Sequence, residues 1–210
     1  MQITPLRIEG AWRVDPVQHA DERGVFLEWF KGGAFTEAVG HAFDLRQANA
    51  SVSAAGVVRG VHFTDVPPSQ AKYVTCPAGA VLDVIVDLRV GSATFGQWES
   101  VLLDSTTRAA VYISEGLGHA FMALEDGSTV VYLCSTAYNP TGEHGVNPLD
   151  PELAIAWPAA SPAGAPLTPR LSPKDAAAPS LADALGRGVL PSYAEVLEFR
   201  AGLRSPGNGH

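Results

Sequence analysis

Strand-like segments follow one another closely through the first two thirds of this chain. From about residue 25 to residue 140, runs rich in β-branched and aromatic residues recur about every 8–12 residues, with Gly or Pro between them. Examples are Val57–Phe63, Ala71–Cys76 and Gly127–Pro140. Short strands at this spacing are typical of a β-sandwich or a small barrel. We therefore predict a mainly β domain.

The composition is consistent with one folded domain that has a substantial core. The chain has 210 residues, 46% hydrophobic and 17% charged, so disorder is not expected over most of its length. Its net charge of −8 argues against a general nucleic-acid-binding surface, which needs a basic face. The N-terminus lacks the pattern of a signal peptide, and no apolar run reaches the roughly 18 residues of a membrane span. We expect a cytoplasmic protein in which Cys76 and Cys134 are small buried hydrophobic residues.

Five segments of different character make up this single domain. Residues 1–20 predict an edge strand, or an arm that pairs with another subunit. Residues 21–140 hold the barrel strands, and residues 141–180, rich in Pro and Ala, predict a loop-rich crossing. Residues 181–204 have helical spacing with a Gly-Pro break, and we expect the tail, 205–210, to be disordered.

Two reactive side chains, His62 and Lys72, lie in consecutive strand-like segments. The turn Pro67-Pro68-Ser69 separates the segments, because proline lacks the N–H that a strand ladder needs. Side chains on neighbouring strands can point into one space without depending on flexible loops. Arg23 and Arg59 are also expected to face the interior or mouth of this barrel. Burying so much positive charge is costly, which favours a functional site.

A histidine, a lysine and a tyrosine in one concave site suit proton abstraction beside a carbonyl group. His62 would take the proton, Lys72 would stabilise the resulting enolate, and Tyr132 would return a proton from the other side. Asp175 could orient the imidazole of His62 or cap the following turn, and the sequence leaves both roles open. A single histidine or tyrosine in a strand is often a structural core residue. The interpretation therefore depends on finding the histidine, the lysine and the tyrosine together.

A metal site is not expected. Metal-binding barrels of the cupin type use two clustered histidines, a carboxylate and a later histidine. Here the residue two positions after His62 is Thr64, and the later His119 follows a worn version of the second cupin motif. Two histidines without a nearby carboxylate are too few to hold a metal. The run Gly116–Gly118 is also too short for a dinucleotide fingerprint, so no cofactor is expected.

Six motifs occur in a fixed order along the chain: RGVHF, PPSQAKYV, DVIVDLRVGSATFGQW, YISEGLGHAF, VVYLCSTAYNP and LSPKDAAAP. Together they resemble the dTDP-4-dehydrorhamnose 3,5-epimerases, from about Asp21 to Pro179. The resemblance implies a cupin-type jelly-roll barrel without metal, with a short helical C-terminal segment. It also implies a homodimer that acts in nucleotide-sugar biosynthesis.

The resemblance assigns roles to matching positions. It implies that His62 is the base with Asp175 as its partner, that Lys72 stabilises the enolate, and that Tyr132 is the acid. Tyr138 would stack on the thymine ring. The other positions that would contact the nucleotide or sugar are Arg23, Glu28, Gln47, Asn49, Arg59, His119, Glu143 and Lys174. Two of these, Arg23 and Glu28, could serve the neighbouring subunit's site, because N-terminal strands tend to be exchanged in this family.

The first functional hypothesis is an epimerase that inverts C3 and C5 of dTDP-4-dehydro-6-deoxy-D-glucose to give dTDP-4-dehydro-L-rhamnose. Both carbons flank the C4 ketone, so one carbonyl acidifies both protons. The second is a C3-only or C5-only epimerase in the synthesis of a secondary-metabolite deoxysugar. The third is a non-catalytic sugar-nucleotide-binding module, and a metal-dependent cupin is the fourth. Departures from the family pattern, such as the proline-rich segment 158–170, leave the sugar specificity open.

Overall fold

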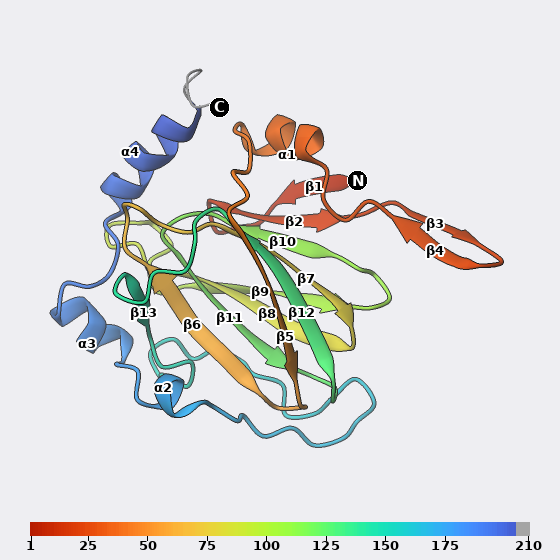
Figure 1. Ribbon diagram of the computed structural model, residues 1–210. Helices are drawn as coiled ribbons and strands as arrows, with labels where there is room; N and C mark the ends of the chain where they lie inside the picture. Colours follow the sequence, from red (N-terminus) through yellow and green to blue (C-terminus); the bar gives the residue numbers. More distant parts are fainter. Residues whose placement is uncertain (205–210) are drawn as a thin grey trace.

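The computed structural model describes residues 1–204, and two antiparallel sheets that face each other form its centre (Figure 1). The larger sheet has six strands. In order of pairing they are β1 (Gln2–Pro5), β2 (Ala11–Asp15), β10 (Ala110–Ile113), β7 (Lys72–Ala78), β12 (Ser128–Cys134) and β5 (Gln47–Ser53). The mainly β architecture predicted from the strand spacing is therefore confirmed.

The smaller sheet has five strands. In order of pairing they are β13 (Glu143–Gly145), β6 (Val58–Thr64), β11 (Leu117–Ala123), β8 (Ala80–Asp87) and β9 (Trp98–Asp104). The Pro67-Pro68 turn therefore carries the chain from β6 in one sheet to β7 in the other. The expectation that His62 and Lys72 lie on neighbouring strands is wrong, because the two strands belong to opposite sheets.

The main hydrophobic core fills the space between the two sheets. Val74 and Val130 contribute from the six-stranded sheet, and Ile85 and Phe121 from the five-stranded sheet. Alternate residues of each strand point to the same face, so a strand with apolar residues at every second position can bury one face. Burying a side chain of this size stabilises the fold by about 1.5–3 kcal/mol. This packing makes the sheets a rigid frame for polar side chains at one end of the barrel.

The N-terminal residues form two separate structures. β1 and β2 form one edge of the six-stranded sheet. β3 (Gln18–Asp21) and β4 (Gly24–Leu27) pair only with each other, and this hairpin projects away from the barrel (Figure 1). Residues 21–27, expected to begin the barrel strands, thus belong to a projecting hairpin and not to the barrel. Phe26 of this hairpin is 68% exposed, which is unusual for an aromatic residue.

Within residues 1–204, four helices lie outside the sheets. α1 (Gly32–Val39) packs Phe35 against Tyr73 and Tyr112, on the face of the six-stranded sheet that points away from the main core. The others follow the loop-rich segment: α2 (Pro173–Ala176), α3 (Leu181–Gly186) and α4 (Tyr193–Arg204). The predicted C-terminal helical segment, with its break between residues 188 and 191, is therefore confirmed. Residues 205–210, expected to be disordered, lie outside the described residues.

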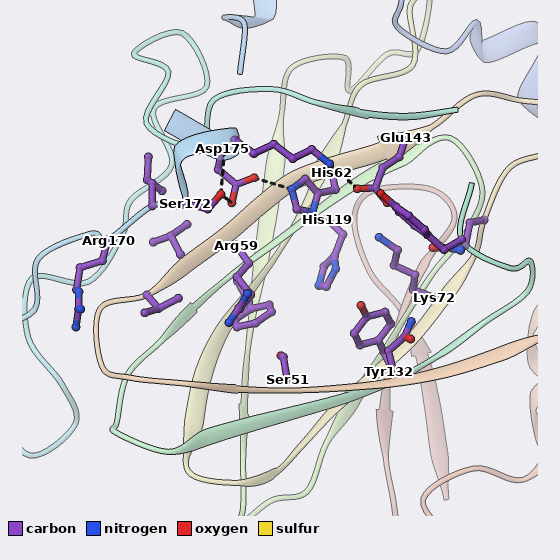
Figure 2. A pocket seen from close by; sticks show the side chains of 18 of the residues that line it. Ser51, Arg59, His62, Lys72, His119, Tyr132, Glu143, Arg170, Ser172 and Asp175 are labelled. Atoms are coloured by element: carbon purple, nitrogen blue, oxygen red, sulfur yellow. Dashed lines mark hydrogen bonds and ion pairs between the residues drawn. The ribbon is translucent and has the colours of Figure 1, made fainter. Parts of the chain in front are cut away.

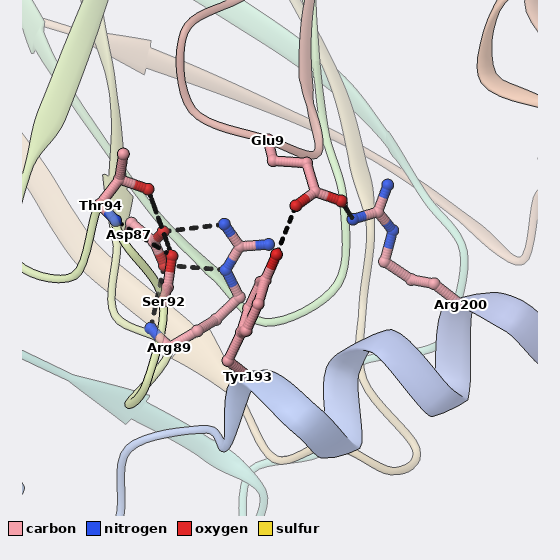
Figure 3. Close-up of polar contacts among 7 residues, drawn as sticks. All are labelled: Glu9, Asp87, Arg89, Ser92, Thr94, Tyr193 and Arg200. Atoms are coloured by element: carbon pink, nitrogen blue, oxygen red, sulfur yellow. Dashed lines mark hydrogen bonds and ion pairs between the residues drawn. The ribbon is translucent and has the colours of Figure 1, made fainter.

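Polar contacts attach α4 to the barrel (Figure 3). Glu9, in the turn between β1 and β2, accepts hydrogen bonds from the hydroxyl of Tyr193 at 2.6 Å and from Nη1 of Arg200 at 3.2 Å. The guanidinium of Arg89 lies 5.1 Å from the centre of the Tyr193 ring. Arg89 is fully buried and pairs with Asp87, with 2.8 Å between Nε and Oδ1. This cluster connects the end of β8 to the C-terminal helix.

Cys76 and Cys134 are both free and buried, as predicted. Among the helices of residues 1–204, none is long and apolar enough to cross a membrane.

Candidate active site

A cavity of about 680 Å³ opens between the two sheets, a volume typical of small-molecule sites. β5, β7 and β12 form one wall, β6 and β11 form the opposite wall, and the segment from Arg170 to Asp175 forms a third side. Every predicted site residue except Arg23 and Glu28 lines this cavity. Figure 2 shows the polar side chains that converge on it.

His62 and Asp175 form a hydrogen-bonded pair at the upper wall of the cavity in Figure 2, with 2.7 Å between Nε2 and Oδ1. Asp175 is only 6% exposed. Burial by itself raises the pKa of Asp175, but hydrogen bonds from His62 and Ser172 outweigh it, and the pKa lies below its ordinary value. A carboxylate can only accept, so Nε2 of His62 carries the proton. In the neutral ring, Nδ1 then has the lone pair that a base needs.

A short capped helix holds Asp175 in place. Ser172 is the N-cap of α2, and its Oγ accepts the backbone N–H of Asp175 at 3.0 Å. The same hydroxyl donates to Oδ2 of Asp175 at 2.8 Å. Pro173 follows at the first helical position, where its missing N–H leaves no bond unmade. Ser172 therefore caps the helix, and the carboxylate of Asp175 is free to orient the imidazole.

Gly60 lets β6 approach β11 closely beside His62. Its φ is +110°, which strains any residue with a side chain, and a Cβ there would clash with the backbone of His119 and Ala120. The close approach puts His62 directly opposite His119 in the pairing of the two strands. The close contact between β6 and β11 therefore explains why the RGVHF motif has a glycine at position 60.

Lys72 and Tyr132 lie on the opposite wall from His62. Their strands, β7 and β12, are neighbours in the six-stranded sheet. Burial lowers the pKa of Lys72, while Cys134, Glu143 and Asp83 oppose this change. Burial raises the pKa of Tyr132, so its hydroxyl stays protonated at neutral pH. The ammonium and the phenol thus face the imidazole across the cavity (Figure 2).

His119 also has a carboxylate partner. Its Nε2 lies 2.8 Å from Oδ2 of Asp83, which is fully buried on β8. The expectation that the histidines lack a nearby carboxylate is therefore wrong, since His62 and His119 each have one. Within residues 1–204 there is nevertheless no group of three His, Cys, Asp or Glu side chains that could hold a metal ion.

Two exposed arginines, Arg59 and Arg170, also line the cavity. Arg59 of β6 donates from Nε to Ser53 Oγ at 3.2 Å. Arg170 was not predicted from the sequence, because the proline-rich crossing that contains it has no regular pattern. Backbone hydrogen bonds hold it against β6: its N–H donates to Gly56 and its carbonyl accepts from Val58. Ser51 and Ser172 are two further lining residues that the sequence did not indicate.

Exposed residues surround the mouth of the cavity. Tyr138 is 54% exposed, and its backbone N–H donates to Gln47 Oε1 at 2.9 Å. Lys174 of α2 reaches Glu143 of β13, with 3.1 Å between Nζ and Oε1. This ion pair joins the helix that carries Asp175 to the strand beside β6.

Arg23 and Glu28 lie away from this cavity. Arg23 is at the tip of the β3–β4 hairpin and pairs with Asp21, and Glu28 pairs with Lys31. The prediction that Arg23 faces the interior or mouth of the same barrel is wrong. The reason is that the hairpin leaves the barrel before the turn that contains Arg23 (Figure 1).

The arrangement suits proton transfer on both faces of a flat intermediate. An imidazole and a phenol lie on opposite walls, and the amine of Lys72 comes from the strand next to that of the phenol. Groups of these types can act as a base, an acid and a stabiliser of negative charge. The dTDP-4-dehydrorhamnose 3,5-epimerase family model matches residues 5–183, nearly all of the barrel and its loop-rich extension. The chain belongs to this family of dTDP-sugar epimerases.

Individual relatives support the assignment. The chain is 57% identical over 206 residues to a dTDP-4-dehydrorhamnose 3,5-epimerase of Mycolicibacterium smegmatis, covering 97% of this chain and 98% of the relative. It is 54% identical over 208 residues to a dTDP-4-dehydrorhamnose 3-epimerase of Streptomyces niveus, covering 99% and 97%. The solved structure of the Mycobacterium tuberculosis rmlC epimerase superposes with a TM-score of 0.93 at 51% identity, covering 97% of this chain and all of that one. This likeness confirms the predicted jelly-roll fold.

Proposed function

We propose that this epimerase inverts both C3 and C5 of dTDP-4-dehydro-6-deoxy-D-glucose and gives dTDP-4-dehydro-L-rhamnose. The observation that carries the proposal is the position of His62 on one wall of the cavity, opposite Lys72 and Tyr132 on the other. Inversion at carbon requires removal of a proton from one face and delivery of a proton to the other. A base and an acid on opposing sheets supply both.

The reaction proceeds through an enolate at each carbon. His62 removes the proton beside the C4 ketone, and Asp175 stabilises the imidazolium that forms. The C4 oxygen gains negative charge, which Lys72 stabilises from within a buried site where electrostatic interactions are strong. Tyr132 then gives its proton to the opposite face of the carbon. The same groups can serve C3 and C5 once the sugar ring has rotated.

Positive side chains around the cavity favour a nucleoside diphosphate. Arg59, Arg170 and Lys174 line it, although the whole chain carries a net charge of −8. Arginine and lysine provide charge-assisted hydrogen bonds to phosphate oxygens. We propose that Tyr138, exposed at the mouth, stacks on the thymine ring, with Gln47, Asn49, His119 and Glu143 as further contacts for the substrate.

A C3-only epimerase is the second candidate. The 3-epimerase of Streptomyces niveus is 54% identical to this chain, close to the 57% of the 3,5-epimerase of Mycolicibacterium smegmatis. Overall identity therefore does not separate the two activities. Both use proton transfer beside the C4 ketone, and they differ in whether C5 is also inverted.

We also propose that the protein acts as a homodimer in which the β3–β4 hairpin reaches the partner. The hairpin projects from the barrel and exposes Phe26 at 68% and Val25 at 43%. Arg23 and Glu28 would then serve the partner's cavity. Light scattering after size exclusion should show a dimer, and Phe26→Asp should shift it toward monomer. A wild-type monomer at micromolar concentration would contradict this proposal.

The activity is tested by identifying the sugar that the protein produces. The protein is incubated with dTDP-4-dehydro-6-deoxyglucose, the ketone is reduced with borohydride, and the released sugars are separated by chromatography. Rhamnose forms only if both carbons were inverted. Sugars inverted at C3 alone would support the second candidate, and recovery of only the uninverted sugars would overturn both. His62→Asn serves as the inactive control.

A further inference from the structure

A chain of side-chain amides runs along the wall of the cavity beside Tyr132. It begins at the backbone N–H of Tyr138, which donates to Oε1 of Gln47 at 2.9 Å. Nε2 of Gln47 donates to Oδ1 of Asn49 at 2.8 Å. Nδ2 of Asn49 then donates to Sγ of Cys134 at 3.6 Å. Gln47 and Asn49 can form this chain because they are alternate residues of β5 and point to the same side.

The backbone N–H of Tyr138 sets the direction of every hydrogen bond in this chain of amides. The two ends of an amide side chain have nearly the same shape, so its orientation is decided by its partners. A backbone N–H can only donate, so the carbonyl oxygen of Gln47 must face Tyr138. Its nitrogen therefore faces Asn49, and the nitrogen of Asn49 is left to face β12. Asn49 thus presents a donor, and not an acceptor, to that strand.

Tyr132 is the residue of β12 that pairs directly with Asn49. Both residues line the cavity, and the donating amide nitrogen of Asn49 is on the side that faces β12. Burial raises the pKa of Tyr132, and Cys134 and Glu143 raise it further, whereas the Asn49 side chain lowers it. An amide lowers the pKa of a phenol when it presents its N–H to the phenol oxygen. A tyrosine whose oxygen faces such a donor keeps its own proton free to be given away, and the donor stabilises the phenolate that remains.

We propose that Asn49 is a positioning residue for Tyr132, held in its donating orientation by Gln47 and the backbone N–H of Tyr138. This inference rests on the proposed function of Tyr132 as the acid. The chain of amides connects Tyr138, at the mouth of the cavity, to Tyr132, which delivers the second proton. A substrate whose nucleotide orders Tyr138 would therefore also fix the hydrogen bond that prepares Tyr132.

His62 takes one proton from the carbon, and Tyr132 gives a different proton to the opposite face and recovers it from solvent. If Tyr132 is badly oriented, His62 exchanges the abstracted proton with solvent and returns a deuteron to the face from which the proton came. The carbon then carries deuterium without inversion. The ratio of exchanged substrate to inverted product therefore rises when delivery from Tyr132 fails.

The experiment measures this ratio in deuterated water for wild type, Asn49→Asp, Asn49→Ala and Tyr132→Phe. Both Asn49 variants lose the donor, and only aspartate adds charge, so an effect common to both is due to the lost hydrogen bond. We expect both to raise the ratio by about tenfold or more, toward the value of Tyr132→Phe, since general acid catalysis contributes about 10²–10⁴-fold. Thermal melting shows whether each variant is folded, and the Kd for dTDP shows whether it still binds the nucleotide.

Gln47→Glu tests the direction of the chain. Glutamate still accepts from Tyr138, but it cannot donate to Asn49, so the Asn49 amide should turn and present its oxygen to Tyr132. We expect the ratio to rise as in Asn49→Asp, although Gln47 pairs with Cys134 and not with Tyr132. An unchanged ratio in folded Asn49 variants, or equal loss of exchange and inversion, would overturn the inference. Absence of exchange in the wild type would instead overturn the proposed function.

Discussion

Replacing Asp175 by asparagine removes one charge from the His62–Asp175 pair and keeps the size of the side chain. The two groups are 2.7 Å apart between Nε2 and Oδ1, which places their charge centres about 4 Å apart. At an effective dielectric constant of about 20, the attraction between the carboxylate and an imidazolium is then about 4 kcal/mol. The side chain of His62 is 27% exposed, so solvent screening reduces this to about 2–4 kcal/mol. Loss of this energy when the imidazolium forms predicts a fall in kcat of about 30- to 1,000-fold.

The assay is the initial rate of epimerisation at saturating substrate, with the Kd for dTDP measured separately. The Kd should stay close to wild type, because Asp175 contacts the base and not the nucleotide in this account. Ser172→Ala is the matched control: it keeps the charge of the carboxylate but removes one hydrogen bond to it, worth about 1 kcal/mol, together with the cap of α2, and should lower kcat less than tenfold while Tm falls. A kcat for Asp175→Asn within about threefold of wild type would refute the role of the pair.

Three other substitutions test separate parts of the account. Tyr138→Ala should weaken binding of dTDP by about 1–3 kcal/mol, the scale of stacking on a nucleobase, and an unchanged Kd in calorimetry would remove Tyr138 from the site. Lys72→Met should abolish turnover yet raise Tm at pH 7 by about 2–4 °C, because burial lowers the pKa of Lys72. The unfolded chain keeps the Lys72 proton to a higher pH than the folded protein does. The stability of wild type relative to the variant should therefore rise as the pH increases toward about 10. Asp87→Ala leaves the fully buried Arg89 without its partner and should cost about 3–5 kcal/mol in urea unfolding, and a cost below about 1 kcal/mol would contradict the importance of this pair.

The strand pattern and the short motifs predicted the local structure well. The segments around His62, Lys72 and Tyr132 are strands, because their β-branched residues alternate or run together between Gly and Pro turns. The pairing of His62 with Asp175 came from the resemblance to a family, because 113 residues separate them and no local pattern relates them. The serine that caps α2 explains why an SPKD segment can hold a carboxylate at a fixed position.

Features that depend on the pairing of distant strands could not be predicted. The sequence does not show that β6 and β7 belong to opposite sheets, and this is what puts His62 and Lys72 face to face. The contact of Asp83 with His119 likewise depends on the pairing of β8 with β11. The hairpin with Arg23 was misplaced because an exposed hairpin and a barrel strand both have high β propensity.

The most direct test of the central claim is proton NMR of dTDP-4-dehydro-6-deoxyglucose incubated with the protein in deuterated water. If His62 and Tyr132 exchange and invert both carbons that flank the ketone, deuterium will appear at C3 and at C5, together with the L-rhamno product. Deuterium and inversion at C3 alone would contradict double epimerisation and support the C3-only candidate. No deuterium at either carbon would contradict the assignment of base and acid altogether.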